Sequence, residues 1–266
     1  MRFKVLSDSR AITKIVKTNA VQTAYHVVSL ALAHSKTSGH QACPNASPSC
    51  IDACVGGENV GLASIWPSVM AGRINRTLRL FDDRAGFLAD LKDDIQKAWR
   101  HAQEDGVKLA VRLNTFSDFR WEEPNFGSVP YDFPYVSFYD YSKVYTRAGR
   151  APANYSLCFS WTERLQDQAT CIDILKNGHN VSIVFATRGP GFTGPRAMEQ
   201  PLPKRITLDG DRFEVIDGDI TDLRLPDTDG GPTRSGRGRV VGLRLKASNN
   251  AAHERAVNAG FCIVQD

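Results

Sequence analysis

The sequence predicts an α/β protein of the (β/α) TIM-like barrel type, with a complete or an incomplete ring of strands and a metal-binding cysteine loop after the first strand. About eight short apolar segments alternate with connections, some of which are helical, and this alternation is typical of such barrels. Strands that are apolar throughout indicate burial on both faces, as in a parallel sheet. The 266 residues, 42% of them hydrophobic, suffice for one domain with its own core.

The predicted strands are short apolar runs rich in β-branched and aromatic residues. They cover residues 25–32, 108–113, 135–139, 155–159, 181–185, 213–216, 240–245 and 261–264. Polar loops follow most of these strands, so irregular backbone begins where the strands end. No internal repeat interrupts this order.

Three helices are predicted between the strands. Residues 82–105 have apolar side chains at helical spacing, with aspartates at the start and Gly106 after the end. Residues 66–80 form a second helix, on which Arg73, Arg76 and Arg79 share one face. That face is either solvated or an anion clamp, because guanidinium groups suit carboxylate and phosphate. A third helix follows Ser160 and Glu163, whose spacing predicts a capping box.

The remaining segments and the overall charge set limits on function. Residues 1–20 are predicted to be a basic lead-in and residues 227–239 a mobile loop, so that residues 1–266 form a single domain. The formal charge of +4 does not by itself indicate a nucleic-acid partner. No secretory leader or membrane span is expected, and a cytoplasmic location follows. The sequence gives no indication of the oligomeric state.

The loop after the first predicted strand concentrates the cysteines. Cys43, Cys50 and Cys54 lie within twelve residues, and His40 lies just upstream. Thiolates bind soft and borderline metals, so the loop predicts a zinc or an iron–sulfur site. The spacing C-x6-C-x3-C is not that of a common zinc finger, and three unligated thiols are the alternative. Of the other cysteines, which lie in apolar patterns typical of core packing, any one is a candidate fourth ligand.

Polar residues at the strand ends are the other candidates, because the carboxyl ends of barrel strands share one rim. The predicted catalytic residues are Asp118, Asp140, Lys143 and Asp217, and the predicted cofactor-binding residues are Asn114, Ser117, Ser160, Arg188, Arg73 and Arg76. Carboxylates and hydroxyls at such positions also cap helices and form turns, which is the alternative interpretation. Arg188 opens a Gly/Pro-rich loop, 188–196, that lacks the spacing of a nucleotide-binding P-loop.

Four segments carry a resemblance to a known family. They are residues 38–54, 71–77, 111–118 and 138–143, and the similarity runs from about Lys14 to the C-terminus. They resemble a family of bacteriophage-encoded proteins of the gene product 88 type, which in turn resembles the radical SAM superfamily. This resemblance implies that Cys43, Cys50 and Cys54 hold a [4Fe–4S] cluster whose fourth iron binds S-adenosylmethionine. It also implies the cytoplasm of a phage host. The usual superfamily spacing, C-x3-C-x2-C with an aromatic residue before the last cysteine, is absent, and Ala53 precedes Cys54.

Three functions are compatible with these observations. The first is a radical SAM-like iron–sulfur enzyme that acts on a nucleotide, a nucleic acid or a small metabolite, with phage DNA modification as one example. The second is a barrel enzyme with structural zinc, such as a base-exchanging transglycosylase, with His40 or another cysteine as the fourth ligand. The third is a non-catalytic, metal-stapled protein that binds nucleic acid through Arg73, Arg76, Arg79 and the basic residues 234–239.

Overall fold

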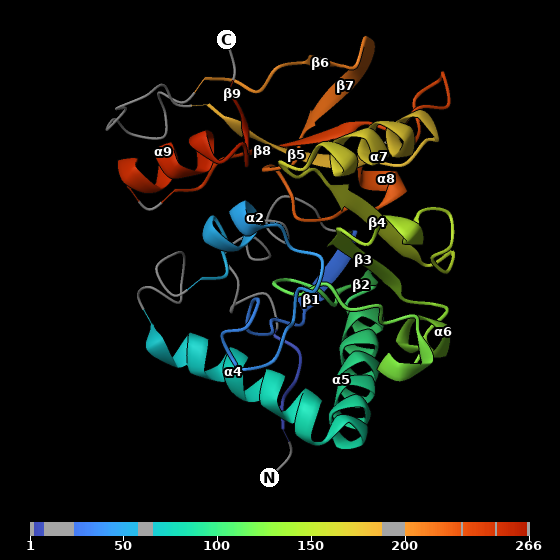
Figure 1. Ribbon diagram of the computed structural model, residues 1–266. Coiled ribbons are helices and arrows are strands. Elements are labelled where there is room, and N and C mark those ends of the chain that lie inside the picture. The colour runs from blue at the N-terminus through green and yellow to red at the C-terminus, as the bar shows by residue number, and fades with distance from the viewer. Residues whose placement is uncertain are drawn as a thin grey trace.

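The computed structural model is a mixed α/β protein built on one twisted sheet (Figure 1). It describes residues 3–7, 24–57, 66–187, 200–229, 231–247 and 249–264. The sheet has nine strands in the order β1-β2-β3-β4-β5-β8-β7-β6, and β9 pairs with β5. All pairs are parallel except the hairpin of β6 and β7.

The strands are β1 (Tyr25–Ser29), β2 (Lys108–Arg112), β3 (Ser137–Ser142), β4 (Tyr155–Ser160), β5 (Val181–Ala186), β6 (Arg205–Leu208), β7 (Asp211–Asp217), β8 (Val240–Arg244) and β9 (Ile263–Val264). The α-helices are α2 (Pro48–Asp52), α4 (Pro67–Asp82), α5 (Arg84–Glu104), α6 (Val129–Asp132), α7 (Leu165–Lys176), α8 (Pro226–Asp229) and α9 (Asn250–Asn258). Two short 3₁₀ helices are η1 (Pro124–Phe126) and η2 (Tyr145–Arg147).

The predicted barrel is wrong, because the sheet stays open. A barrel closes only when its first and last strands pair at a consistent stagger. Here β1 is at one end of the strand order and β6 at the other, and β8 enters between β5 and β7 out of sequence. The connections from β2 to β3 and from β3 to β4 contain only short helices, so a full outer ring of helices does not form either.

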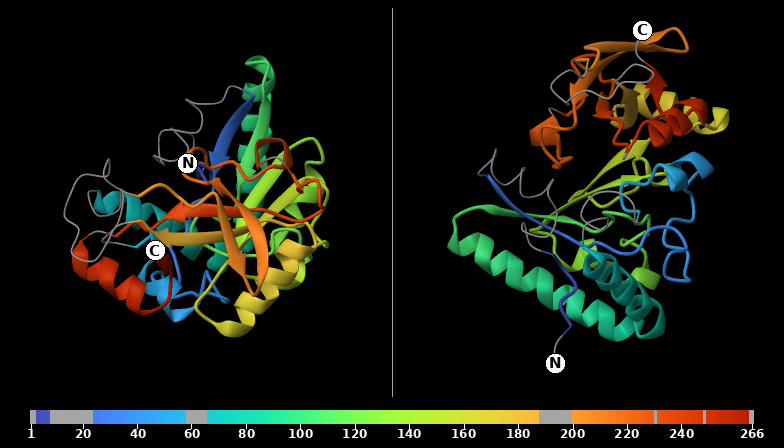
Figure 2. Two further views of the ribbon diagram at one scale, coloured as in Figure 1. Left: turned by 90° about the horizontal axis from the view of Figure 1, so that it is seen from above. Right: turned by 90° about the vertical axis from the view of Figure 1, so that its left-hand side faces the viewer.

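One face of the sheet carries the apolar core. The long helix α5 covers β1, β2 and β3, with Phe87, Leu91 and Ile95 fully buried (Figures 1 and 2). The helix α7 packs beside β4, β5 and β7 in a second apolar cluster that includes Leu175 and Ile183. Each buried side chain of this size contributes roughly 1.5–3 kcal/mol relative to exposure.

The opposite face of the sheet, here called the inner face, is more polar. Side chains alternate between faces along a strand, and at the carboxyl ends this face receives Arg112, Tyr141 and Ser160. The segment 218–225 crosses the inner face, where Leu223 packs with Tyr139. The sheet therefore has one apolar face and one partly polar face, instead of the two apolar faces that the sequence indicated.

The helices predicted at 66–80 and 82–105 are confirmed as α4 and α5, and Asp83 caps α5 by accepting from the Gly86 amide at 3.0 Å. The capping box predicted at Ser160 is wrong, because Ser160 ends β4 and the helix α7 begins at Leu165. None of the described helices combines the length and apolar character needed to cross a membrane.

The two segments predicted to be loose are partly ordered. Val5, in the predicted lead-in, is fully buried, and its amide donates to Asp94 at 2.7 Å. Residues 8–20 of that segment lie outside the described residues. The predicted loop 227–239 contains most of α8, and the Arg239 amide donates to Asn180 at 2.8 Å.

Candidate functional site

A cavity of about 350 Å³ lies on the inner face, at the carboxyl ends of the central strands. Strands β2, β3, β4, β5 and β8 contribute to its walls, and the cysteine loop after β1 closes one side. Its polar lining residues are Cys50, Cys54, Arg73, Arg112, Thr115, Tyr141, Lys143, Ser160, Ser182, Arg244 and Lys246. The remaining lining is apolar or aromatic, including Phe116, Trp161 and Phe261. Active sites of parallel sheets lie at this end of the strands.

The cysteine loop reaches the cavity through the short helix α2. The Ser47 hydroxyl caps this helix by accepting from the Cys50 amide, and Pro48 occupies its first turn. Cys54 lies just after the helix, where its sulfur accepts from the Gly56 amide at 3.4 Å. Cys43 lies before the helix, and its thiol donates to the Phe116 carbonyl at 3.2 Å.

The three thiols of the loop are free, partly exposed and electrostatically coupled. Burial raises the pKa of Cys43 to about 12 and that of Cys54 to about 11, and the charge of Cys50 adds to both shifts. In the described part of the chain, no three His, Cys, Asp or Glu side chains are placed to hold a single metal ion. The metal-binding cysteine loop predicted from the sequence is therefore not found as a preformed metal site among the described residues.

Two cations lie beside the thiols. Burial works to lower the pKa of Lys143, but the charges of Cys50 and Asp118 outweigh it, so that this pKa is raised and the ammonium group stays charged. Arg73 donates to the Gly56 carbonyl at 2.8 Å and lies over the Phe116 ring at 4.2 Å. Positive charge at this position lowers the cost of ionising several neighbouring thiols.

The loop is fixed to the turn between β4 and α7. Glu163 accepts from the Ser49 amide at 3.3 Å, and Arg164 donates to the Asn45 carbonyl at 3.0 Å. On the other side the exposed Asp52 lies 3.6 Å from Arg255 of α9. In Figure 1 and in the right-hand view of Figure 2, α2 lies between α4 and α9. The cavity is therefore bounded by segments from both halves of the chain.

His40, the alternative zinc ligand, faces elsewhere. Its ring stacks on Phe81 at the end of α4, with the ring centroids 4.2 Å apart and the planes 8° apart. Aromatic packing against the helix accounts for its position without a metal.

Four of the predicted site residues, Asn114, Ser117, Asp118 and Asp140, form a buried network just outside the cavity. The Asn114 amide group donates to Asp140, and its carbonyl oxygen accepts from Ser117 and Trp121. Asp118 accepts from the Ser142 hydroxyl and the Lys143 amide, both at 2.8 Å. This network fixes the ends of β2 and β3, which places Lys143 beside the cysteine loop.

The remaining predicted residues fall in different places. Lys143, Ser160 and Arg73 line the cavity. Arg76 donates to the Ala31 carbonyl at 3.0 Å, just after β1, and is not part of the described lining of the cavity. Asp217 pairs with Arg244 at 3.0 Å and so lies behind a lining residue. Arg188 lies outside the described residues.

The prediction did not include Arg112, Tyr141, Ser182 and Arg244, all of which line the cavity. The alternation of small polar and large side chains along a strand could have indicated these residues. In β4, for example, Ser156, Cys158 and Ser160 occupy every second position, between larger side chains. A strand with this pattern has one polar face, and the inner face could have been inferred from it.

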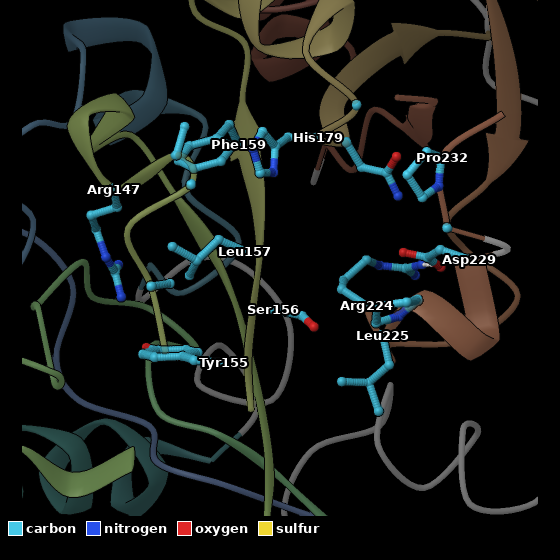
Figure 3. A pocket seen from close by; sticks show the side chains of 17 residues that line it. Arg147, Tyr155, Ser156, Leu157, Phe159, His179, Arg224, Leu225, Asp229 and Pro232 are labelled. Atoms are coloured by element: carbon cyan, nitrogen blue, oxygen red, sulfur yellow. Dashed lines mark hydrogen bonds and ion pairs between the residues drawn. The ribbon is translucent and has the colours of Figure 1, made fainter. Parts of the chain in front are cut away.

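A second cavity, of about 190 Å³, lies at the amino ends of β4 and β5 (Figure 3). Two buried arginines line it, and both are compensated: Arg147 by Glu122 at 2.7 Å and Arg224 by Asp229 at 2.6 Å. In Figure 3 the Ser156 side chain points toward the second of these pairs. This cavity is smaller than the one that contains the cysteines and has no thiol in its described lining, so it is the weaker candidate.

The fold and the site together define an open-sheet α/β protein with three free thiols beside a cationic cavity. The chain belongs to the gene product 88 family, whose model matches residues 4–265. The predicted membership of this family is confirmed, and the match does not extend to radical SAM proteins. Searches of curated proteins and of solved structures gave no match.

Proposed function

We propose that this protein is a radical SAM-like iron–sulfur enzyme, in which Cys43, Cys50 and Cys54 hold a [4Fe–4S] cluster. The observation that supports the proposal best is that Cys50 and Cys54 line one cavity beside Lys143 and Arg73, with Cys43 close enough to interact electrostatically with both thiols. Three protein thiolates leave one iron of such a cluster open for S-adenosylmethionine, and these cofactors supply the radical chemistry.

The donor set fits a cluster better than zinc. A structural zinc site needs four close tetrahedral ligands, and the cysteine loop supplies three thiols among the described residues. His40, which would complete a zinc site, is stacked on Phe81. Sulfur donors alone, in a partly apolar pocket with nearby cations, are the environment that iron–sulfur clusters use.

In this proposal the side chains of the chain have distinct tasks. Lys143 and Arg73 offset the negative charge of the three thiolates. The apolar and aromatic walls of the cavity exclude water from the reacting groups. The substrate class that this cavity suits is a nucleotide, a nucleic acid or a small metabolite, held across the carboxyl ends of β4, β5 and β8.

Anaerobic purification of the full chain, followed by iron, sulfide and zinc analysis, tests the proposal. We expect brown protein with about four irons per chain. Cys54→Ala removes a ligand, so its visible absorbance and iron content should fall to the background level. Cys171→Ala is the matched control, because Cys171 is buried in α7 among apolar residues, and its cluster content should equal that of the wild type.

Two results would contradict the proposal. One is a single tightly bound zinc in place of iron, which would favour the zinc-stapled enzyme. The other is equal loss of absorbance in Cys54→Ala and Cys171→Ala, since it would show that instability of the fold, not loss of a ligand, removes the colour.

A further inference from the structure

The charge of the cysteine cavity is one-sided. Its described lining includes five cationic side chains and no carboxylate. They are Arg73, Arg112, Lys143, Arg244 and Lys246. The acidic partners of this set, such as Asp217 and Asp222, lie behind the lining residues. A cavity with cationic walls and low-polarity surroundings concentrates anions.

Three residues that line this cavity each have a buried donor with no hydrogen-bond partner among the described residues. The donors are Arg73 Nε, Arg112 Nε and Thr115 Oγ1. Arg73 is only 5% exposed, so that water does not readily compensate for the missing bond. Buried polar groups in native proteins are nearly always satisfied, and one left without a partner costs about 1–3 kcal/mol.

Both guanidinium groups are held firmly by their other nitrogens. Arg112 donates through Nη1 to the two Asp222 oxygens at 2.9 Å and lies 4.9 Å from the Tyr141 ring centre. Arg73 is held in the same way by the Gly56 carbonyl and the Phe116 ring. Each arginine therefore has a fixed position, and its buried Nε donor has no partner among the described residues.

The number of unsatisfied donors points to phosphate. A phosphate monoester has three terminal oxygens and can accept from three separate donors, whereas a carboxylate has two oxygens and pairs best with a single guanidinium fork. Lys143 adds positive charge to the same cavity, whereas Arg244 and Lys246 are already paired with Asp217 and Asp219 at 3.0 and 3.1 Å.

The rest of the lining indicates the body of the ligand. Phe116, Tyr141, Trp161 and Phe261 give flat aromatic surfaces on several sides of the cavity. Such surfaces stack on nucleobases, with about 1–3 kcal/mol per base. The volume of about 350 Å³ is at the lower end of the range for small-molecule sites, which suits a single nucleotide better than a polymer.

We propose that the cavity binds a nucleoside monophosphate, with its phosphate on Arg73, Arg112 and Thr115 and its base against the aromatic lining. A nucleoside monophosphate would then be the substrate class of the proposed iron–sulfur enzyme, and its chemical conversion rests on that proposed function. The binding step itself requires no cluster, so it is measured on the cluster-free chain and stands or fails independently of iron analysis.

The experiment is calorimetric titration of the metal-free, reduced full chain with adenosine 5′-monophosphate, adenosine and ribose 5-phosphate. The monophosphate should bind at least tenfold more tightly than either fragment, because each fragment lacks one of the two recognised parts. Equal affinity for the monophosphate and adenosine would overturn the phosphate site, and equal affinity for ribose 5-phosphate would overturn the base site. Tighter binding of a single-stranded oligonucleotide than of the monophosphate would also overturn the proposal, in favour of nucleic acid.

Thr115→Val is the variant of choice, because it removes one donor without disturbing an ion pair. It should weaken binding of the monophosphate by about tenfold and leave adenosine binding unchanged. Thr170→Val, on the exposed side of α7, is the control and should bind like the wild type. Arg73→Lys, which keeps the charge but loses Nε, should also weaken the monophosphate selectively. Unchanged affinity in both Thr115→Val and Arg73→Lys would contradict the assigned phosphate site.

Discussion

Asp140 shows how a polar residue at a strand end can be structural. It is fully buried on β3 and accepts hydrogen bonds from the Tyr155 hydroxyl at 2.5 Å and from the backbone amide of Asn114 at 2.7 Å. Burial raises the pKa of Asp140 to about 7, although the bond from Tyr155 and the charge of Arg112 oppose the shift. The carboxyl group thus titrates near neutral pH inside the fold.

This shift predicts a loss of stability as the pH rises. The unfolded chain ionises Asp140 near pH 4, whereas the folded chain holds the proton until about pH 7. The folded state therefore binds more protons in this window, and its stability declines from about pH 4 to pH 7. Asp140→Asn lacks this dependence. Relative to that variant, the wild type should lose roughly 2–3 kcal/mol between about pH 5 and pH 7.5 in urea unfolding.

The control is Asp82→Asn, which removes an exposed carboxylate at the end of α4 without disturbing the buried network and is measured over the same pH range. A pH-independent difference between wild type and Asp140→Asn would show that Asp140 titrates as an ordinary surface carboxyl.

The sequence predicted where such residues lie along the chain but not what they contact. Asn114 and Asp118 were expected at the end of a strand, and they are found just after β2. Their side chains turn to the backbone and to Trp121 and Ser142, and these partners depend on the three-dimensional arrangement of loops. Alternation along β4 was the local signal that could have indicated the inner face.

The cysteine loop depends on its neighbours more than on its own helix. The helix α2 has only five residues, and isolated helices of that length are unstable in water. The carboxylate of Glu163 stabilises this short helix, because it accepts a hydrogen bond from the Ser49 amide in the first turn of α2. Burial works to raise the pKa of Glu163, but hydrogen bonds from Ser47 and Ser49 outweigh it and lower this pKa.

Removing this carboxylate should loosen the loop without unfolding the protein. In Glu163→Ala the first-turn amides of α2 lose an acceptor, so residues 47–54 should exchange amide hydrogen about tenfold faster. Glu254→Ala, on the exposed surface of α9, is the control and should leave exchange in this segment unchanged. If Glu163→Ala exchanges at the wild-type rate in residues 47–54, the proposed contact does not hold the loop.

The long helices could be predicted from the sequence, but the short elements could not. Helices α4 and α5 combine helical periodicity with clear ends. The helix α9 buries only Ala256, which gives too weak an apolar pattern, although its Asn249 cap was a usable signal. Strand β6 has only four residues, half of them exposed, and pairing with β7 is what orders it.

At the scale of the molecule, the order of the strands could not be derived from local sequence. Consecutive parallel pairing from β1 to β5 agrees with a barrel. The strand order differs from that of a barrel after β5, because β8 inserts between β5 and the β6–β7 hairpin. The position of β8 in the sheet depends on pairing between strands that are far apart in the sequence, and the sequence of a single strand does not show which partner it will have. With no closure, the inner face needs another support, and the segment that follows β7 provides it.

Asp222 in that segment is the central contact, since it joins the segment to β2 and β3. It is fully buried, pairs with Arg112 at 2.9 Å and accepts from the Tyr139 hydroxyl at 3.1 Å. Asp222→Asn leaves the arginine charge buried without its partner, so unfolding in urea should show a loss of about 3 kcal/mol or more. The matched control is Asp132→Asn, which breaks an exposed pair with Lys92 and should cost less than about 1 kcal/mol. Equal stability of the two variants would mean that the inner face does not depend on this pair, and the open sheet would then have to be held together by its apolar face alone.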